Sequence, residues 1–189
     1  MYRKLLPPFE VIAFEDMNKK QVERYFNWFM ETEDERIQYL QEYINKDRSI
    51  ALDRSPESLI TLWEWFEDKV EWVLETPEEL ERQMINRPEW MRVHIYENPY
   101  KFSEETVLIA MDIAVYFGET LIKNHPSVYW GYVMKPKKLH GVKRPVLRGF
   151  QGNECVYPYT LISVCIRRSS KVRNREELFE TYQIWEKHV

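Results

Sequence analysis

Three side chains that could act as general acids or bases occur on or just after one apolar stretch of the chain. They are Asp112, Glu119 and His125, within residues 103–130. Two carboxylates and an imidazole can exchange protons with a substrate when they share a pocket. If the stretch is helical, however, Asp112 and Glu119 are roughly 10 Å apart along the axis, too far to perturb each other directly. An enzyme with these three groups around a polar pocket is therefore an alternative and not our first interpretation.

The same stretch has the pattern of one long, mostly buried helix. Ser103 can cap its N-terminus, and Pro126 requires the helix to end. One narrow polar stripe interrupts its apolar surface: Glu105, Asp112, Tyr116, Glu119 and Lys123. We interpret this stripe as a solvated edge on which Glu119 and Lys123 form an ion pair.

The other residues capable of chemistry form no known catalytic or metal-binding pattern. The chain has no Walker loop, dinucleotide fingerprint, HExxH, CxxC or GxSxG motif. The histidines are far apart in the sequence: His94, His125, His140 and His188. A Cys–His nucleophile assembled only in space is a further alternative. We predict no catalytic residue, no metal and no cofactor, so enzyme activity is less favoured than binding.

The two cysteines and the hydropathy pattern bear on the cellular compartment. Cys155 and Cys165 have apolar neighbours, and we predict free buried thiols in a reducing compartment; a disulfide between neighbouring strands is the alternative. No apolar run is long enough to span a bilayer, and the first residues do not resemble a signal peptide. We therefore predict a cytoplasmic protein with no membrane partner.

Charge is divided unevenly along the chain. Residues 126–189 contain 12 Lys and Arg against 5 Asp and Glu, a net of +7, whereas residues 1–125 contain 15 against 26, a net of −11. The basic residues gather in segments 135–148 and 167–175, and the proposed basic patch is Lys135, Lys137, Lys138, Lys143 and Arg144. A basic patch over aromatic strands could bind nucleic acid. Because the net charge is negative, we favour attraction between acidic helices and basic strands instead.

Aromatic residues are the best candidates for a binding surface. Five of them fall outside the inward faces of the predicted helices: Trp28, Tyr39, Tyr43, Trp65 and Trp72. Trp65 and Trp72 are seven residues apart and would stack on one helix face. Such aromatics dominate the energetics of many interfaces. We predict that they contact another protein or a second copy of the chain, the alternative being that a second layer of the same chain covers them.

The first half of the chain is predicted to be mainly helical. A short strand is expected over residues 6–14, followed by a helix over 18–45 in which a capping box at Thr32 indicates a restart or a kink. Ser55 and Pro56 start a helix that should continue to residue 74, and Thr76 starts another. Residues 87–102 give the least distinct pattern, and Trp90 and Tyr96 are expected to anchor them.

The second half changes to strands after Pro126. Strands are predicted over residues 128–133, 145–150 and 159–167, and a last helix over 174–188. Together these elements indicate an α+β fold in which the central buried helix packs on a small antiparallel sheet. We predict one domain, residues 1–189, with a mainly helical half (1–102) and a half containing the central helix, the strands and the last helix (103–189).

A weak likeness to known sequences begins at the end of the central helix. Tyr116-Phe117-Gly118-Glu119, followed by Tyr129-Trp130-Gly131 and by Pro145-Val146, resembles uncharacterised bacterial domains of unknown function, some of which look like immunity proteins. The resemblance covers about residues 105–150. It implies a cytosolic bacterial protein that acts by binding, and it implies no catalytic residues. Our first hypothesis is therefore protein–protein binding, immunity-like or homodimeric, ahead of nucleic-acid binding and of an enzyme of unknown class.

Overall fold

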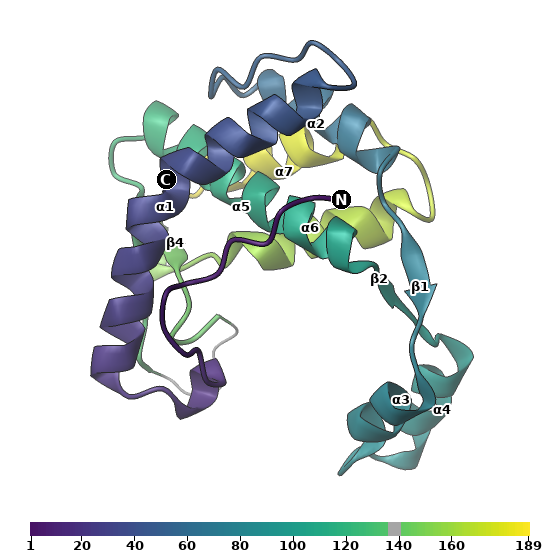
Figure 1. The fold of residues 1–189 in the computed structure, drawn as a ribbon. Helices are drawn as coiled ribbons and strands as arrows, with labels where there is room; N and C mark the ends of the chain where they lie inside the picture. Colours follow the sequence, from purple (N-terminus) through teal and green to yellow (C-terminus); the bar gives the residue numbers. More distant parts are fainter. Residues whose placement is uncertain (136–140) are drawn as a thin grey trace.

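The long buried helix predicted after Ser103 lies at the centre of the molecule. In the computed structural model, which describes residues 1–135 and 141–189, it is helix α5, Glu104–Asn124. The Ser103 hydroxyl caps it by accepting a hydrogen bond from the Thr106 backbone N–H at 3.2 Å. Helices α1, Lys19–Asn45, and α6, Pro158–Ser169, pack against α5 (Figure 1), and most residues of α5 from Thr106 to Leu121 are buried. The prediction of a central buried helix is confirmed.

Helix α1, Lys19–Asn45, is one continuous element. The predicted restart at Thr32 is wrong, because Thr32 lies inside the helix and its hydroxyl donates to the carbonyls of Trp28 and Phe29 at 2.9 and 3.2 Å. Such bonds to the preceding turn bend helices. Figure 1 shows α1 changing direction along its length, which agrees with the alternative of a kink.

The predicted third strand, residues 159–167, is a helix. It belongs to α6, Pro158–Ser169, which packs against α5. Ile162, Cys165 and Ile166 are buried, and their spacing of three and four residues places them on one side of a helix. A short, nearly continuous apolar run fits a buried strand or a buried helix equally well. Contact with α5, which the sequence pattern does not show, decides between them.

Helices α2, Ser58–Glu67, and α7, Glu177–Glu186, pack against each other. The last helix was predicted and is confirmed, with shorter bounds. The prediction that α2 continues to residue 74 is wrong. The chain leaves the helix after Glu67, and the Glu71 backbone N–H donates to the Thr106 hydroxyl at 2.9 Å. This bond to the first turn of α5 holds the backbone in a direction that α2 could not follow.

The strands form two separate antiparallel pairs. The predicted strands 128–133 and 145–150 are confirmed as a pair, and the second pair joins two segments that the sequence pattern did not assign to strands. The pairs are β3, Tyr129–Gly131, with β4, Val146–Arg148, and β1, Trp72–Leu74, with β2, Tyr100–Phe102. The fold is therefore α+β and predominantly helical.

The N-terminal segment is extended but forms no strand, so the prediction for residues 6–14 is wrong. It runs over α1 and α5 to a 3-10 turn, Phe14–Asp16 (Figure 1). Side-chain bonds hold it there: the Tyr2 hydroxyl donates to Asp112 at 2.8 Å, and Lys4 pairs with Glu104 at 2.8 Å. Two consecutive prolines in this segment lack the N–H groups that a strand would need.

Two short helices extend from the rest of the molecule on the β1–β2 stem. They are α3, Pro77–Met84, and α4, Glu89–Glu97, which pack against each other. The helix start predicted at Thr76 is confirmed, and a capping box forms there, with Thr76 and Glu79 bonded reciprocally. Figure 1 shows this pair standing away from the other helices. We call residues 72–102 the arm and the remaining described residues the body.

Candidate functional site: an exposed helical arm

The middle of the polar stripe of α5 is buried in the body, at Asp112, Tyr116 and Glu119, whereas Glu105 is half-buried and Lys123 exposed. The interpretation of the whole stripe as a solvated edge is therefore wrong. Asp112 is 5% exposed, and its carboxylate accepts from Arg36 Nη1 at 2.7 Å and from the Tyr2 hydroxyl at 2.8 Å. Burial raises the pKa of Asp112, and the Arg36 guanidinium opposes that shift. Asp112 thus joins the N-terminal segment, α1 and α5 in one structural network.

Glu119 is a partner for a tryptophan rather than for Lys123. Its Oε1 accepts from the Trp130 indole N–H at 2.8 Å, and Lys123 donates instead to the Asp53 carbonyl at 2.7 Å. The indole lies directly on Gly118, where an added Cβ would be 2.3 Å from Trp130 Cζ2. The Gly-Glu pair of the YFGE motif is therefore explained by packing of the β3 tryptophan on α5.

The three candidate acid–base groups do not form a catalytic set. His125 Nε2 lies 3.0 Å from the Tyr182 hydroxyl at the end of α5. Asp112 and Glu119 are engaged by Arg36 and Trp130, respectively. Each group has its own structural partner, and these contacts indicate no shared proton-transfer site.

Most of the predicted aromatic site is covered by the chain itself. Trp28 and Trp65 are buried, and the Trp65 indole N–H donates to Asp47 at 3.1 Å. Tyr39 and Tyr43 are half-buried under Tyr2, each in an edge-to-face ring contact with it. These four residues belong to a second layer of the same chain, which is the alternative that the sequence left open.

Trp72 is on a different element from Trp65, so the predicted stack of the two indoles on one helix is wrong. Trp72 begins β1, at the root of the arm, and its ring centroid lies 4.5 Å from that of Phe102 on β2. The Arg167 guanidinium lies over both rings, at 5.4 and 5.1 Å from their centroids. Trp72 therefore connects the arm to α6.

Apolar side chains are exposed along the whole arm. No residue of α3 or α4 is buried, and the expectation that Trp90 and Tyr96 anchor the segment is wrong, since they are 69% and 63% exposed. The other large exposed hydrophobics of the arm are Leu74, Ile85, Val93 and Tyr100. Isolated helices of this length are marginal in water, and clustered exposed apolar groups commonly mark contact sites.

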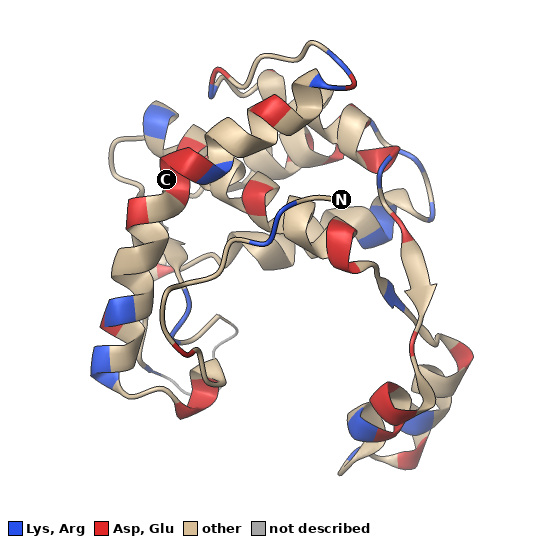
Figure 2. Cartoon of the chain, in the orientation of Figure 1, with Lys and Arg blue, Asp and Glu red and all other residues tan. Residues whose placement is uncertain are grey.

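The sequence contained a signal for this surface. Trp90, Val93 and Tyr96 recur every three residues between two prolines, a spacing that places them on one side of a short helix. The pattern alone does not show whether that side faces the core or solvent. The arm is also mildly acidic, with six Glu against four Lys and Arg over residues 72–102, and both kinds of charge are distributed over it in Figure 2.

The basic segments are used largely within the molecule. Lys143 donates to the Glu15 and Met17 carbonyls at 2.6 Å, and Arg144 lies over the Phe14 ring at 4.1 Å. In segment 167–175, ion pairs join the basic residues to acidic residues of α2 and α7: Arg168–Glu177, Arg173–Glu67, Arg173–Asp68 and Arg175–Glu64. Lys137 and Lys138 lie outside the described residues. Lys135 is described and exposed. The ion pairs of Arg173 and Arg175 agree with attraction between the acidic residues 1–125 and the basic residues 126–189, whereas Arg168–Glu177 lies within the second of these segments.

No protein-family model, curated protein or solved structure matches the chain. The resemblance to immunity-like bacterial domains therefore stays a prediction. Within residues 1–135 and 141–189, no group of three or more His, Cys, Asp or Glu side chains could hold a metal ion, and no helix is long and apolar enough to cross a membrane. Both cysteines are free, and burial raises the pKa of Cys165 to about 11.

Proposed function

We propose that the protein acts by binding another protein and that the arm is the element that makes the contact. The observation that carries this proposal is the exposure of Trp90, Val93 and Tyr96 on a helical pair with no buried residue of its own. Aromatic side chains of this kind supply most of the binding energy in many interfaces. A partner would supply the apolar contacts that these side chains lack in the isolated chain.

The charge of the arm indicates the chemistry of the partner. The arm, residues 72–102, has six Glu against four Lys and Arg, a net charge of −2, so the complementary surface is an apolar groove with a basic rim. An immunity-like protein of the bacterial cytoplasm, which covers a basic surface of its target, is one form of this proposal. A homodimer in which the arm contacts a second copy is the competing form.

The test compares two double variants, each of which removes two exposed apolar side chains, in different places. Trp90→Ser with Tyr96→Ser changes the arm, where these side chains are 69% and 63% exposed, and Tyr129→Ser with Ile184→Ser changes the body, where they are 50% and 51% exposed. A partner is isolated from the source cells with the unchanged chain, purified, and titrated by calorimetry. We expect the arm variant to weaken binding about 100-fold or more and the body variant to leave it within about threefold.

Two results would overturn the proposal in this form. Equal binding by the arm variant and the unchanged chain would place the interface elsewhere. A doubling of mass in light scattering as concentration rises, lost in the arm variant only, would assign the arm to a second copy instead of a basic partner. Binding to the basic partner should also weaken as salt is raised.

A further inference from the structure

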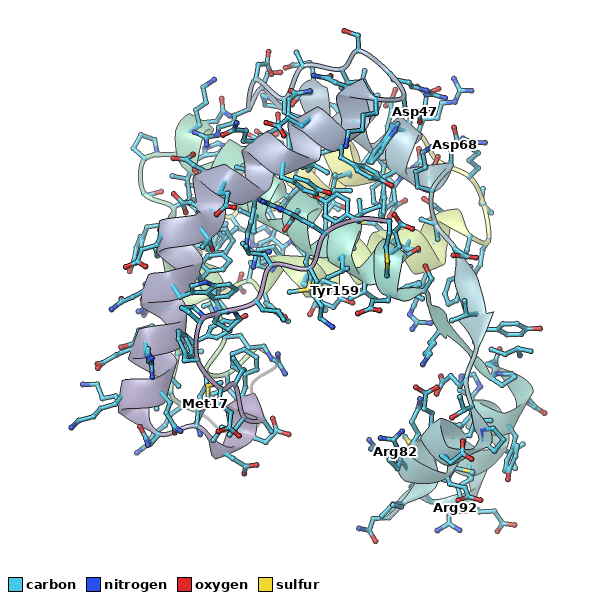
Figure 3. The ribbon with its side chains drawn as sticks, viewed as in Figure 1. Met17, Asp47, Asp68, Arg82, Arg92 and Tyr159 are labelled. Atoms are coloured by element: carbon cyan, nitrogen blue, oxygen red, sulfur yellow. The ribbon has the colours of Figure 1, made fainter. Side chains whose placement is uncertain are left out.

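A polar pocket of about 210 Å³ lies at the root of the arm. Glu67 at the end of α2, Ser169 at the end of α6 and Trp72 at the start of β1 line it, and Asp68 marks the same region in Figure 3. A cavity that holds one water molecule needs a volume of only roughly 10–15 Å³. The pocket is therefore large enough for a small organic group.

Two buried polar atoms from its walls have no hydrogen-bond partner within the described residues. They are Glu67 Oε1 and Ser169 Oγ. The Glu67 side chain is only 6% exposed, and its other oxygen, Oε2, accepts from Arg173 Nε at 3.2 Å. A buried carboxylate oxygen without a donor is unfavourable. A ligand that donates hydrogen bonds to both atoms would remove that cost.

The electrostatics of the pocket favour a cation. Helices α2 and α6 both end there, at Glu67 and Ser169, and a helix C-terminus carries a partial negative charge. Arg173 also pairs with Asp68, whose Oδ1 accepts from Arg173 Nη2 at 2.6 Å. Asp68 is in turn neutralised by Arg48, which donates to its Oδ2 at 3.1 Å, and Arg167 lies over the Trp72 ring. The attraction for a further positive donor therefore comes from the unpaired Glu67 Oε1 and the two helix C-termini.

Three of the walls are apolar. Val70, Trp72 and Ile166 line the pocket beside the polar atoms, so a ligand with methylene groups next to its charge would fit both kinds of surface. We propose that this pocket binds a primary alkylammonium group, of a free amine or of a lysine side chain, which donates to Glu67 Oε1 and Ser169 Oγ. The pocket would bind this group whether or not the arm binds another protein.

Occupation of the pocket would affect the arm, because Trp72 is both a wall of the pocket and the first residue of β1. An alkyl chain packed on the indole, with its ammonium held by α2 and α6, would fix the stem of the arm to the body. The group would thereby limit the directions in which Trp90 and the other exposed side chains of the arm can point.

The test uses n-pentylamine and Nα-acetyl-lysine methylamide as probes. Each is titrated at constant ionic strength while the Trp72 indole N–H is followed by NMR, with a Trp72→Phe variant to assign the signal. We expect saturable shifts with a Kd on the order of millimolar and no comparable shift with n-pentanol. Stronger binding of n-pentylamine would identify a free amine as the ligand, and stronger binding of the lysine derivative would identify a protein side chain.

The matched variants are Glu67→Gln and Glu64→Gln. Both glutamates are on α2 and pair with an arginine of segment 167–175, but Glu64 does not line the pocket. We expect Glu67→Gln to weaken amine binding tenfold or more, and Glu64→Gln to leave it unchanged. Ser169→Ala gives a second check if Glu67→Gln unfolds the protein. Absence of a saturable shift, an equal response to n-pentanol, or full binding by both Glu67→Gln and Ser169→Ala would overturn the proposal.

Discussion

Trp65 and Trp90 show how differently the chain uses one residue type in its body and in its arm. Trp65 is 1% exposed, packs edge-to-face on Tyr43 and donates its indole N–H to Asp47. Trp90 is 69% exposed on α4. In Figure 3 the arm is marked by Arg82 and Arg92, well away from Asp47 in the body. The difference teaches that the body is stabilised by its own contacts, whereas the apolar groups of the arm are available for contact with something else.

Substituting the two tryptophans is the most direct way to break this comparison. We expect Trp65→Ala to cost about 3–5 kcal/mol, because it removes a packed aromatic side chain, and Trp90→Ala to change stability by less than about 0.5 kcal/mol. Thermal and urea unfolding of the isolated protein measure both. A large loss of stability in Trp90→Ala would show that the arm packs on the body and would remove the basis of the proposed function.

The buried ion pair between Arg36 on α1 and Asp112 on α5 allows buried and exposed charged groups to be compared in the same way. We expect Arg36→Met to cost about 3–5 kcal/mol, because it leaves the buried Asp112 carboxylate without its cation. The double variant Arg36→Met with Asp112→Leu should recover much of that loss. Arg3→Met, which breaks the more exposed pair with Glu35, is the control and should cost less than about 1 kcal/mol. The midpoints of urea-induced unfolding of these variants and of the unchanged chain measure the differences in stability.

The close contact between α5 and β3 should respond to a single methyl group. We expect Gly118→Ala to cost about 1–3 kcal/mol, because the new Cβ would overlap the Trp130 indole and force it to move. Gly131→Ala is the control, since the nearest atom there is the flexible Arg148 side chain, and it should cost less. A Gly118→Ala protein with unchanged melting temperature and Trp130 fluorescence would contradict this packing.

The stability contributed by one carboxyl group of the body and by one of the arm should change with pH in opposite directions. In the body, burial and then the nearby Glu119 raise the pKa of Glu33 to about 7 from 4.5. The folded state therefore holds this proton more tightly than the unfolded state, and stability should fall as pH rises from about 4.5 to about 7. Glu33→Gln should flatten that part of the profile, whereas Glu31→Gln, an exposed control on the same helix, should not.

In the arm, the hydrogen bond from Lys101 lowers the pKa of Glu79. The contribution of Glu79 to the free energy of unfolding is present above its pKa in the unfolded state. It is lost as pH falls through its lower pKa in the folded state. The contribution is small because the Lys101–Glu79 pair is only partly buried and remains accessible to solvent. Melting temperatures measured between pH 3 and pH 8 on the four proteins, namely the unchanged chain, Glu33→Gln, Glu31→Gln and Glu79→Gln, would test both directions. A profile that Glu33→Gln leaves unchanged would contradict the assignment of the raised pKa.

Local sequence determined those features of the protein that depend on neighbouring residues. Ser103 caps α5, and Thr76 forms its capping box with Glu79 in α3, because donor and acceptor are only three residues apart. The length and apolar character of α5 and the β3–β4 pair followed from residue type and spacing. The α+β class could therefore be predicted without knowledge of any long-range contact.

Tertiary structure decided every feature that depends on a distant partner. Asp112 looked like part of a solvated edge, because Arg36 and Tyr2, which neutralise and cover it, are 76 and 110 residues away. Residues 159–167 became a helix because α5 offers a surface to one of its sides. Trp65 is buried and Trp90 exposed for the same reason: an apolar side chain is buried only where the fold supplies a surface to meet it. That supply depends on the path of the whole chain, which no short pattern of residues contains.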